Sequence, residues 1–223
     1  MNIRIYILSY NDETFNFALQ KYQSLPWAKV IKIDSSVLFE SIVFDSWLID
    51  NFHDWNNYDY IGFLSWKFEQ KIPFASLEYA FNILNYDNSI EVFPLFYGNP
   101  IYFFDAKNLY PILDILFDNL GFEKNFISNN RFKPFYCNYW IAKKNILIEY
   151  IYFFKRCVNI INSNKDIQNL IWDNIHYANI ANIDLMKIFN KPYYCYHPFI
   201  YERIPIFFFH NKKIYIPPNL PFK

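Results

Sequence analysis

A polar and cationic corner closes the most apolar strand that the sequence predicts. The run Asp59–Leu64 is typical of a strand in a covered sheet, and Ser65, Trp66 and Lys67 follow it directly. Open α/β sheets place their ligands at the carboxyl ends of strands. A hydroxyl, an aromatic face and an ammonium group at such a point would suit a phosphorylated ligand that carries a ring. A buried strand that runs into an ordinary loop explains the same residues, and Asp59 could serve only as a local cap or ion-pair partner.

Two neighbouring features add to this corner. Gly62 is one of only three glycines among 223 residues, and a glycine inside a strand indicates that another group approaches the backbone closely. Lys67 and Lys71 could supply the positive charge that a diphosphate needs. The alternative interpretation is that both lysines are solvated on a surface loop and bind nothing.

A second polar corner closes the first predicted strand, residues 3–9. It reads Ser9-Tyr10-Asn11-Asp12. At a sheet edge, an aromatic ring and an amide could hold a nucleobase by stacking and hydrogen bonding. Asn and Asp are also typical helix caps, and one turn could fill both roles.

The second half of the chain offers four more candidate residues. Asn138 occurs in an apolar strand, where a buried amide must find a partner in the protein or in a ligand. His197, Glu202 and Arg203 bring an imidazole, a carboxylate and a guanidinium within seven residues. They could supply a general base and a cation that faces a phosphate. A local surface pair of Glu202 with Arg203 is the alternative.

Composition and missing motifs disfavour several functional classes. Hydrophobic residues make up 53% of the chain and aromatic residues 23%, which argues against disorder. Lys plus Arg and Asp plus Glu number 21 each, so no large nucleic-acid surface is expected. No apolar run approaches the ~18 residues of a membrane span. Walker, GxGxxG, GxSxG and HExxH motifs are absent, and the four histidines are too scattered to suggest a metal site.

The termini and cysteines suggest a cytoplasmic protein. The chain opens on Met1-Asn2-Ile3-Arg4, which leads straight into strand-like alternation and lacks the apolar stretch of a signal peptide. Cys137, Cys157 and Cys195 are odd in number and widely spaced. Reduced thiols explain them better than a disulfide framework or a zinc site.

Strands alternate with helices along the first 100 residues, which predicts a largely parallel sheet with covered faces. No flexible linker divides the chain, so we expect one α/β domain over residues 1–223. Strands are expected at residues 3–9, 29–33, 59–64, 90–96 and 134–141. Helices are expected at residues 13–25, 35–52, 75–85, 105–121 and 143–162, then one or two within 165–189 and a short one near 199–208. The proline-rich tail is expected to be extended.

The order of these segments resembles that of nucleotide-sugar glycosyltransferases with the GT-A fold, of the capsular-polysaccharide and giant-virus (chlorella-virus-like) types. Those enzymes carry a strand of the type DYxGxxHYRR, matched here by the ten residues from Asp59 to Phe68. Ser65, Lys67 and Phe68 stand where that motif has histidine and its two arginines. Asn138-Tyr139-Trp140 resembles a later N-M-F-like strand that leads into a helix with an E-Y pair, here Glu149-Tyr150. Glu202-Arg203 matches a closing E-R pair.

The resemblance implies a mixed, mainly parallel sheet flanked by helices, with a nucleotide-sugar half at residues 1–100 and an acceptor half at residues 101–223. It implies transfer of a sugar from a nucleoside-diphosphate sugar, with UDP-sugars favoured, to a hydroxyl of a glycan or glycoprotein. In a viral protein this would occur in the host cytoplasm. A non-catalytic glycan- or protein-binding module of the same fold is the alternative.

The resemblance also assigns roles. Glu202 or His197 would be the base, and Lys67 with Arg203 would face the diphosphate. The remaining donor contacts would come from Ser9, Tyr10, Asn11, Asp59, Ser65, Trp66 and Asn138. No D-x-D motif occurs near Leu64, so a divalent cation (Mn²⁺ or Mg²⁺) is possible but is not implied by the motif, and a lone carboxylate or the lysines could replace it.

Overall fold

A computed structural model describes residues 1–97, 108–124, 126–129, 132, 138–177 and 184–216. Several predicted features lie outside these residues. They are the helix cap at Asp105, the first part of the strand at 134–141, Cys137 and the tail at 217–223. Cys157 and Cys195, which are described, are both buried and free.

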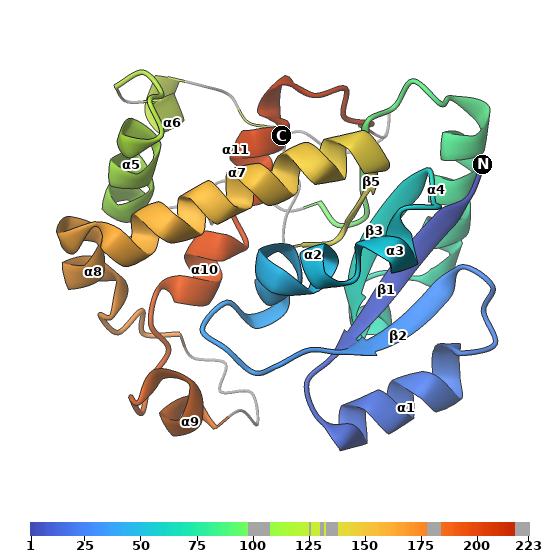
Figure 1. Cartoon of the computed structure of the whole chain (residues 1–223), viewed down its shortest axis with the longest axis horizontal. Helices are drawn as coiled ribbons and strands as arrows, with labels where there is room; N and C mark the ends of the chain where they lie inside the picture. The colour runs from blue at the N-terminus through green and yellow to red at the C-terminus, as the bar shows by residue number, and fades with distance from the viewer. Residues whose placement is uncertain (98–107, 125, 130–131, 133–137, 178–183, 217–223) are drawn as a thin grey trace.

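The described strands form one five-stranded mixed sheet (Figure 1). They are β1 (Ile3–Ser9), β2 (Ala28–Lys32), β3 (Tyr60–Ser65), β4 (Val92–Pro94) and β5 (Trp140–Lys143). Their order across the sheet is β2-β1-β3-β5-β4. β1 pairs in parallel with both β2 and β3, as predicted, whereas β5 runs antiparallel to both of its neighbours. The α/β class of the prediction is therefore confirmed.

Most predicted helices are present. The longer ones are α1 (Asp12–Tyr22), α4 (Phe74–Tyr86), α5 (Leu109–Asn119) and α7 (Lys144–Ser163). The short ones are α6 (Phe126–Asn129), α8 (Lys165–Ile171), α9 (Leu185–Phe189), α10 (His197–Tyr201) and α11 (Ile204–Phe208). Gly121 follows α5 with a φ of +84°, the left-handed conformation that a glycine after a helix C-cap adopts.

The single long helix expected at residues 35–52 is wrong. Phe39 adopts a positive φ of 49°, so the chain cannot be helical from Ser35 onward. A 3₁₀ turn (Phe39–Ser41), a π-helical turn (Val43–Trp47), α2 (Leu48–Asp50) and α3 (Phe52–Trp55) follow instead. The result is a short, irregular crossover that turns Glu40 toward the end of the sheet.

Helices cover both faces of the sheet (Figure 1). Strand side chains alternate between these two faces. On β1, Tyr6 and Leu8 join the core beneath α5 and α7, and Ile5 and Ile7 join the core beneath α1 and α4. β3 is buried at every position. Because both faces are covered, the ends of the strands are the part of the sheet that remains open to a ligand.

The prediction that another group approaches the Gly62 backbone closely is confirmed, and the groups that do so belong to the core of the sheet. A Cβ placed on Gly62 would lie 2.7 Å from Ile5 Cδ1, 3.0 Å from Ile141 Cγ1 and 3.1 Å from the Trp140 carbonyl oxygen. The Trp140 carbonyl belongs to β5, which pairs with β3 at this level. The glycine lets two strands and their side chains pack closely in the middle of the sheet.

Gly62→Ala is therefore expected to destabilise the protein by about 1–3 kcal/mol, because the Ile5 side chain can rotate away but the Trp140 carbonyl must move with its strand. Urea unfolding measures the change. Gly121→Ala is a useful comparison, because there the cost comes from the positive φ and no atom lies within 4 Å of the new Cβ. A Gly62→Ala protein as stable as the parent would contradict this account of the sheet.

Candidate functional site

A small cavity lies at the carboxyl ends of the parallel strands β1 and β3. Leu8 and Ser65 are register partners on these strands, and both line it. Its volume is about 40 Å³. Leu8, Phe63 and Leu64 form its apolar wall, and its polar side chains are Glu40, Ser65, Lys71, Asn138, Tyr139 and Glu202. The two strand ends thus meet at one site, as a ligand site at this sheet edge requires.

Glu202 is the group in this cavity whose chemistry is most altered. It follows α10, and its side chain is largely removed from solvent. Burial, with a smaller contribution from the negative charge of Glu40, raises the pKa of Glu202 from 4.5 to about 7, against the opposing effect of Arg203 and Lys71. A carboxyl group with a pKa near neutrality can both accept and return a proton at physiological pH.

Glu40 and Tyr10 form a second polar element of the site. The Tyr10 hydroxyl donates a hydrogen bond to the Glu40 carboxylate. Burial and the nearby Glu40 charge raise the pKa of Tyr10 well above its usual value. Tyr10 is therefore a neutral hydrogen-bond donor that holds one oxygen of Glu40 in place.

Ser65, Tyr139 and Asn138 complete the polar wall. The Ser65 Oγ and Tyr139 hydroxyl oxygens are 2.7 Å apart and share a buried hydrogen bond. The Asn138 amide donates to Ser41 Oγ at 2.9 Å, while its Oδ1 has no hydrogen-bond partner among the described residues. Asn138 lies just before β5, not inside a strand as predicted.

The two lysines considered from the sequence occupy different places. The Lys71 ammonium lies 5.5 Å from the ring centre of Tyr139, and Lys71 lines the cavity. Lys67 is exposed and lies 5.7 Å above the Trp66 ring. Trp66 in turn packs edge-on against Phe17 of α1, with 5.6 Å between ring centres. Neither Trp66 nor Lys67 lines the cavity.

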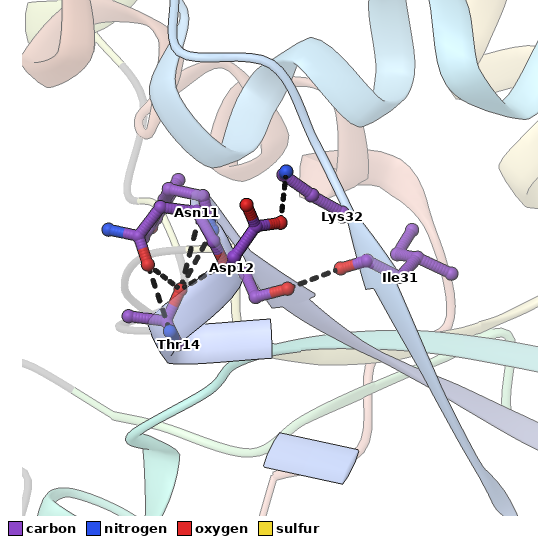
Figure 2. Close-up of polar contacts among 7 residues, drawn as sticks. Asn11, Asp12, Thr14, Ile31 and Lys32 are labelled. Atoms are coloured by element: carbon purple, nitrogen blue, oxygen red, sulfur yellow. Dashed lines mark hydrogen bonds and ion pairs between the residues drawn. The ribbon is translucent and has the colours of Figure 1, made fainter. Parts of the chain in front are cut away.

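At the end of β1, the hydrogen bonds favour the structural interpretation (Figure 2). Ser9 is fully buried, and its hydroxyl donates to the Ile31 carbonyl at 2.9 Å. Asn11 caps α1 by accepting from the Thr14 amide at 2.9 Å, and Asp12 pairs with Lys32 at 2.7 Å. Of the Ser9-Tyr10-Asn11 set, Tyr10 is the residue whose side chain reaches the site.

Asp59 lies at the opposite end of β3, next to its first residue, and accepts a hydrogen bond from the Asn2 amide at 2.7 Å. A six-residue strand spans roughly 20 Å. Asp59 therefore lies at the amino edge of the sheet, away from the cavity. Its contact with Asn2 agrees with the alternative interpretation, in which Asp59 has only a local partner.

His197 and Arg203 do not line the cavity, although Glu202 lies between them in the chain. The His197 ring packs against Trp172, with 4.3 Å between ring centres, and burial lowers the pKa of His197 to about 4. Arg203 is 3% exposed and donates to the Phe199 carbonyl at 2.6 Å. Between the two candidate bases, the geometry therefore favours Glu202.

Sequence reasoning did not select Glu40 or Tyr139 as site residues. Glu40 was expected on an ordinary helix, and nothing in its neighbourhood signalled the left-handed Phe39 that redirects it. Tyr139 could have been found from its place beside Asn138, because the two residues that lead into β5 lie at the same edge of the sheet.

Within the described ranges, no three His, Cys, Asp or Glu side chains come together as a metal site would require. Among the same residues, no helix combines the length and apolar character needed to cross a bilayer.

Comparison with known proteins identifies no relative. No family model, no curated protein and no solved structure matches this chain. What the protein does must therefore be argued from the site itself.

Proposed function

We propose that this protein is a glycosyltransferase that moves a sugar from a nucleoside-diphosphate sugar to a hydroxyl group of a glycan or glycoprotein. The observation that supports this most is Glu202, a carboxyl with a pKa of about 7 in a cavity at the carboxyl edge of parallel strands. The order of motifs along the chain, which resembles that of GT-A enzymes, supplies the choice of substrates.

In the proposed reaction the acceptor oxygen attacks the anomeric carbon of the donor sugar. The bond from that carbon to the diphosphate breaks, and the diphosphate leaves with the bonding electrons. Glu202 takes the proton of the acceptor hydroxyl, which is the role of a base in an inverting transfer. Lys71 is the cation of the cavity and lies where it could stabilise the leaving diphosphate.

The described side chains of the cavity cannot by themselves complete the coordination shell of a divalent cation. They include two carboxylates, Glu40 and Glu202, and the ammonium of Lys71 beside them. A cation of the Mg²⁺ type prefers an octahedron of oxygen ligands. We therefore assign each step above to side chains of the chain itself.

The size of the cavity favours the second candidate, a non-catalytic glycan- or protein-binding module. A volume of about 40 Å³ is far below the roughly 300–1,000 Å³ of ordinary ligand pockets. In the first candidate, only one end of a substrate enters the cavity and the nucleotide lies outside it. In the second, a saccharide binds and a nucleotide does not.

Calorimetry with UDP-, GDP- and dTDP-sugars, each with and without Mn²⁺, separates the two candidates. Binding of at least one nucleotide-sugar, followed by its slow hydrolysis or by transfer to an acceptor, is expected for the enzyme. Saccharide binding without any nucleotide binding would favour the module. If no nucleotide-sugar binds, the proposed function is wrong.

Lys71→Ala is expected to weaken binding of the free nucleoside diphosphate about five- to tenfold, because one partly exposed charge contact is lost. Lys67→Ala is the matched control, since that ammonium stacks on Trp66 outside the cavity. Calorimetric titration of both variants measures the difference. If Lys67→Ala lost more affinity for the nucleoside diphosphate than Lys71→Ala, the diphosphate would bind at Lys67, as predicted from the sequence.

A further inference from the structure

The cavity contains a buried hydrogen-bond acceptor that has no donor among the described residues. Asn138 is only 3% exposed, and its Oδ1 has no partner among the described residues. Glu40 uses one carboxylate oxygen to accept from Tyr10, which leaves the other. Of the ion pairs found in the described residues, none involves Glu40 or Glu202. A buried acceptor without a partner costs about 1–3 kcal/mol, so a bound group that donates hydrogen bonds would be favoured here.

The same charges disfavour a phosphate inside the cavity. Glu40 stands on one wall and Glu202 on another, and Lys71 alone opposes them. A phosphate there would face two acidic side chains and the carbonyl oxygen of Asn138, with the Lys71 ammonium and one hydroxyl of the Ser65–Tyr139 pair as its donors. The cavity is therefore suited to an uncharged group that bears a hydroxyl.

The volume limits how large that group can be. A cavity measured with water-sized spheres needs about 10–15 Å³ to hold one water molecule, so a space of about 40 Å³ accommodates roughly three non-hydrogen atoms. Leu8, Phe63 and Leu64 offer apolar contact to the carbon. A whole sugar ring does not fit, but an exocyclic arm of one does.

We infer that the cavity receives the hydroxymethyl arm of an uncharged saccharide, with its primary hydroxyl donating toward Glu202, Glu40 or Asn138. This rests on the proposed function, in which Glu202 takes a proton from an acceptor hydroxyl. It adds that this hydroxyl is a primary one, and that the diphosphate stays outside the cavity.

Matched pairs of methyl hexosides test the assignment. Each pair consists of a hexoside and its 6-deoxy counterpart, which differ only in the hydroxyl of the arm, in the gluco, galacto and manno series. Saturation-transfer NMR titrations at pH 7.5 give the dissociation constants. For at least one series we expect the hexoside to bind tenfold or more tightly than its 6-deoxy partner, because a site built to hydrogen-bond a hydroxyl rejects a ligand without it.

Glu40→Gln keeps the shape of the wall but removes its charge, and is expected to reduce that preference at least threefold. Glu78→Gln, on the exposed side of α4, is the control and should leave it unchanged. Thermal unfolding of each variant checks that it is folded. In addition, pyrophosphate should not displace the hexoside from the parent protein.

Equal binding of both members in all three series, or no binding of any hexoside, would overturn the inference. Displacement of the hexoside by pyrophosphate would overturn it too, as would Mn²⁺ binding that is lost in Glu40→Gln. The failure of the proposed function is seen separately in the nucleotide-sugar titrations. A chain that discriminates between the hexosides but binds no nucleotide-sugar has the saccharide site without the transferase.

Discussion

Replacing Glu202 by glutamine is expected to lower kcat for sugar transfer by about 10²–10⁴-fold, the usual contribution of a general base. Glutamine has nearly the same shape but cannot take a proton. Because the pKa of Glu202 is about 7, the parent enzyme should gain activity as the pH rises from 5 to 8 and then level off. Initial rates with a binding nucleotide-sugar and a saccharide acceptor, measured over that pH range, give both quantities.

Donor affinity separates this role from a structural one. Glu202→Gln should bind the nucleoside diphosphate as tightly as the parent does, since the lost group acts on the acceptor. His197→Gln tests the other candidate base. Because the His197 ring is buried, we expect this variant to lose stability but to keep the pH profile of the parent. If Glu202→Gln keeps more than a tenth of the parent activity, another group is the base.

The same substitution is expected to stabilise the protein at alkaline pH. Below pH 4.5, Glu202 is protonated in both the folded and the unfolded chain. Between pH 4.5 and about 7, Glu202 is ionised in the unfolded chain but remains largely protonated in the folded protein. The free energy of unfolding therefore falls as the pH rises. A change in pKa of this size corresponds to a loss of about 3 kcal/mol in the free energy of unfolding above pH 7. Glu202→Gln removes the ionisation and should recover most of that loss.

Urea unfolding at pH 4.5, 6, 7 and 8 measures this effect. We expect the parent and Glu202→Gln to differ little at pH 4.5 and most at pH 8, while Glu78→Gln follows the parent throughout. A variant that is less stable than the parent at pH 8 would show that Glu202 is stabilised as a carboxylate, for example by Lys71. A gain in stability together with a loss of activity would identify Glu202 as a group that is kept for its chemistry.

Local signals were enough to predict most of the fold. The alternation of β1, the Asn11 cap of α1 and the amphipathic pattern of α7 each depend on residues near one another in the chain. The direction of β5 and the break at Phe39 depend on contacts between distant segments. Neither the period of the hydrophobic residues nor a helix cap reveals such contacts. The prediction therefore missed the antiparallel strand β5 and replaced the irregular turns after Phe39 by one long helix.

The site was only partly predictable for the same reason. Ser65 was selected for its place at the carboxyl end of a strand, Asn138 as an amide in an apolar strand, and Glu202 as a candidate base. The fold does bring these three to one cavity. Trp66 and Lys67 follow Ser65 directly, yet the chain turns there and places Trp66 against α1, with the exposed Lys67 over the Trp66 ring. Ser9 and Asn11 satisfy their hydrogen bonds locally, which a list of residue types cannot distinguish from binding.

The place of β5 between β3 and β4 also has a consequence for any attempt to divide this protein into halves. A fragment of residues 1–100 would contain β1, β2, β3 and β4 but would lack β5, the strand that pairs with the far side of β3 and with β4. β3 is buried along its whole length, so its open edge would be a template for intermolecular pairing. Such a fragment is expected to aggregate, and co-expression with residues 138–223 would be needed to cover that edge.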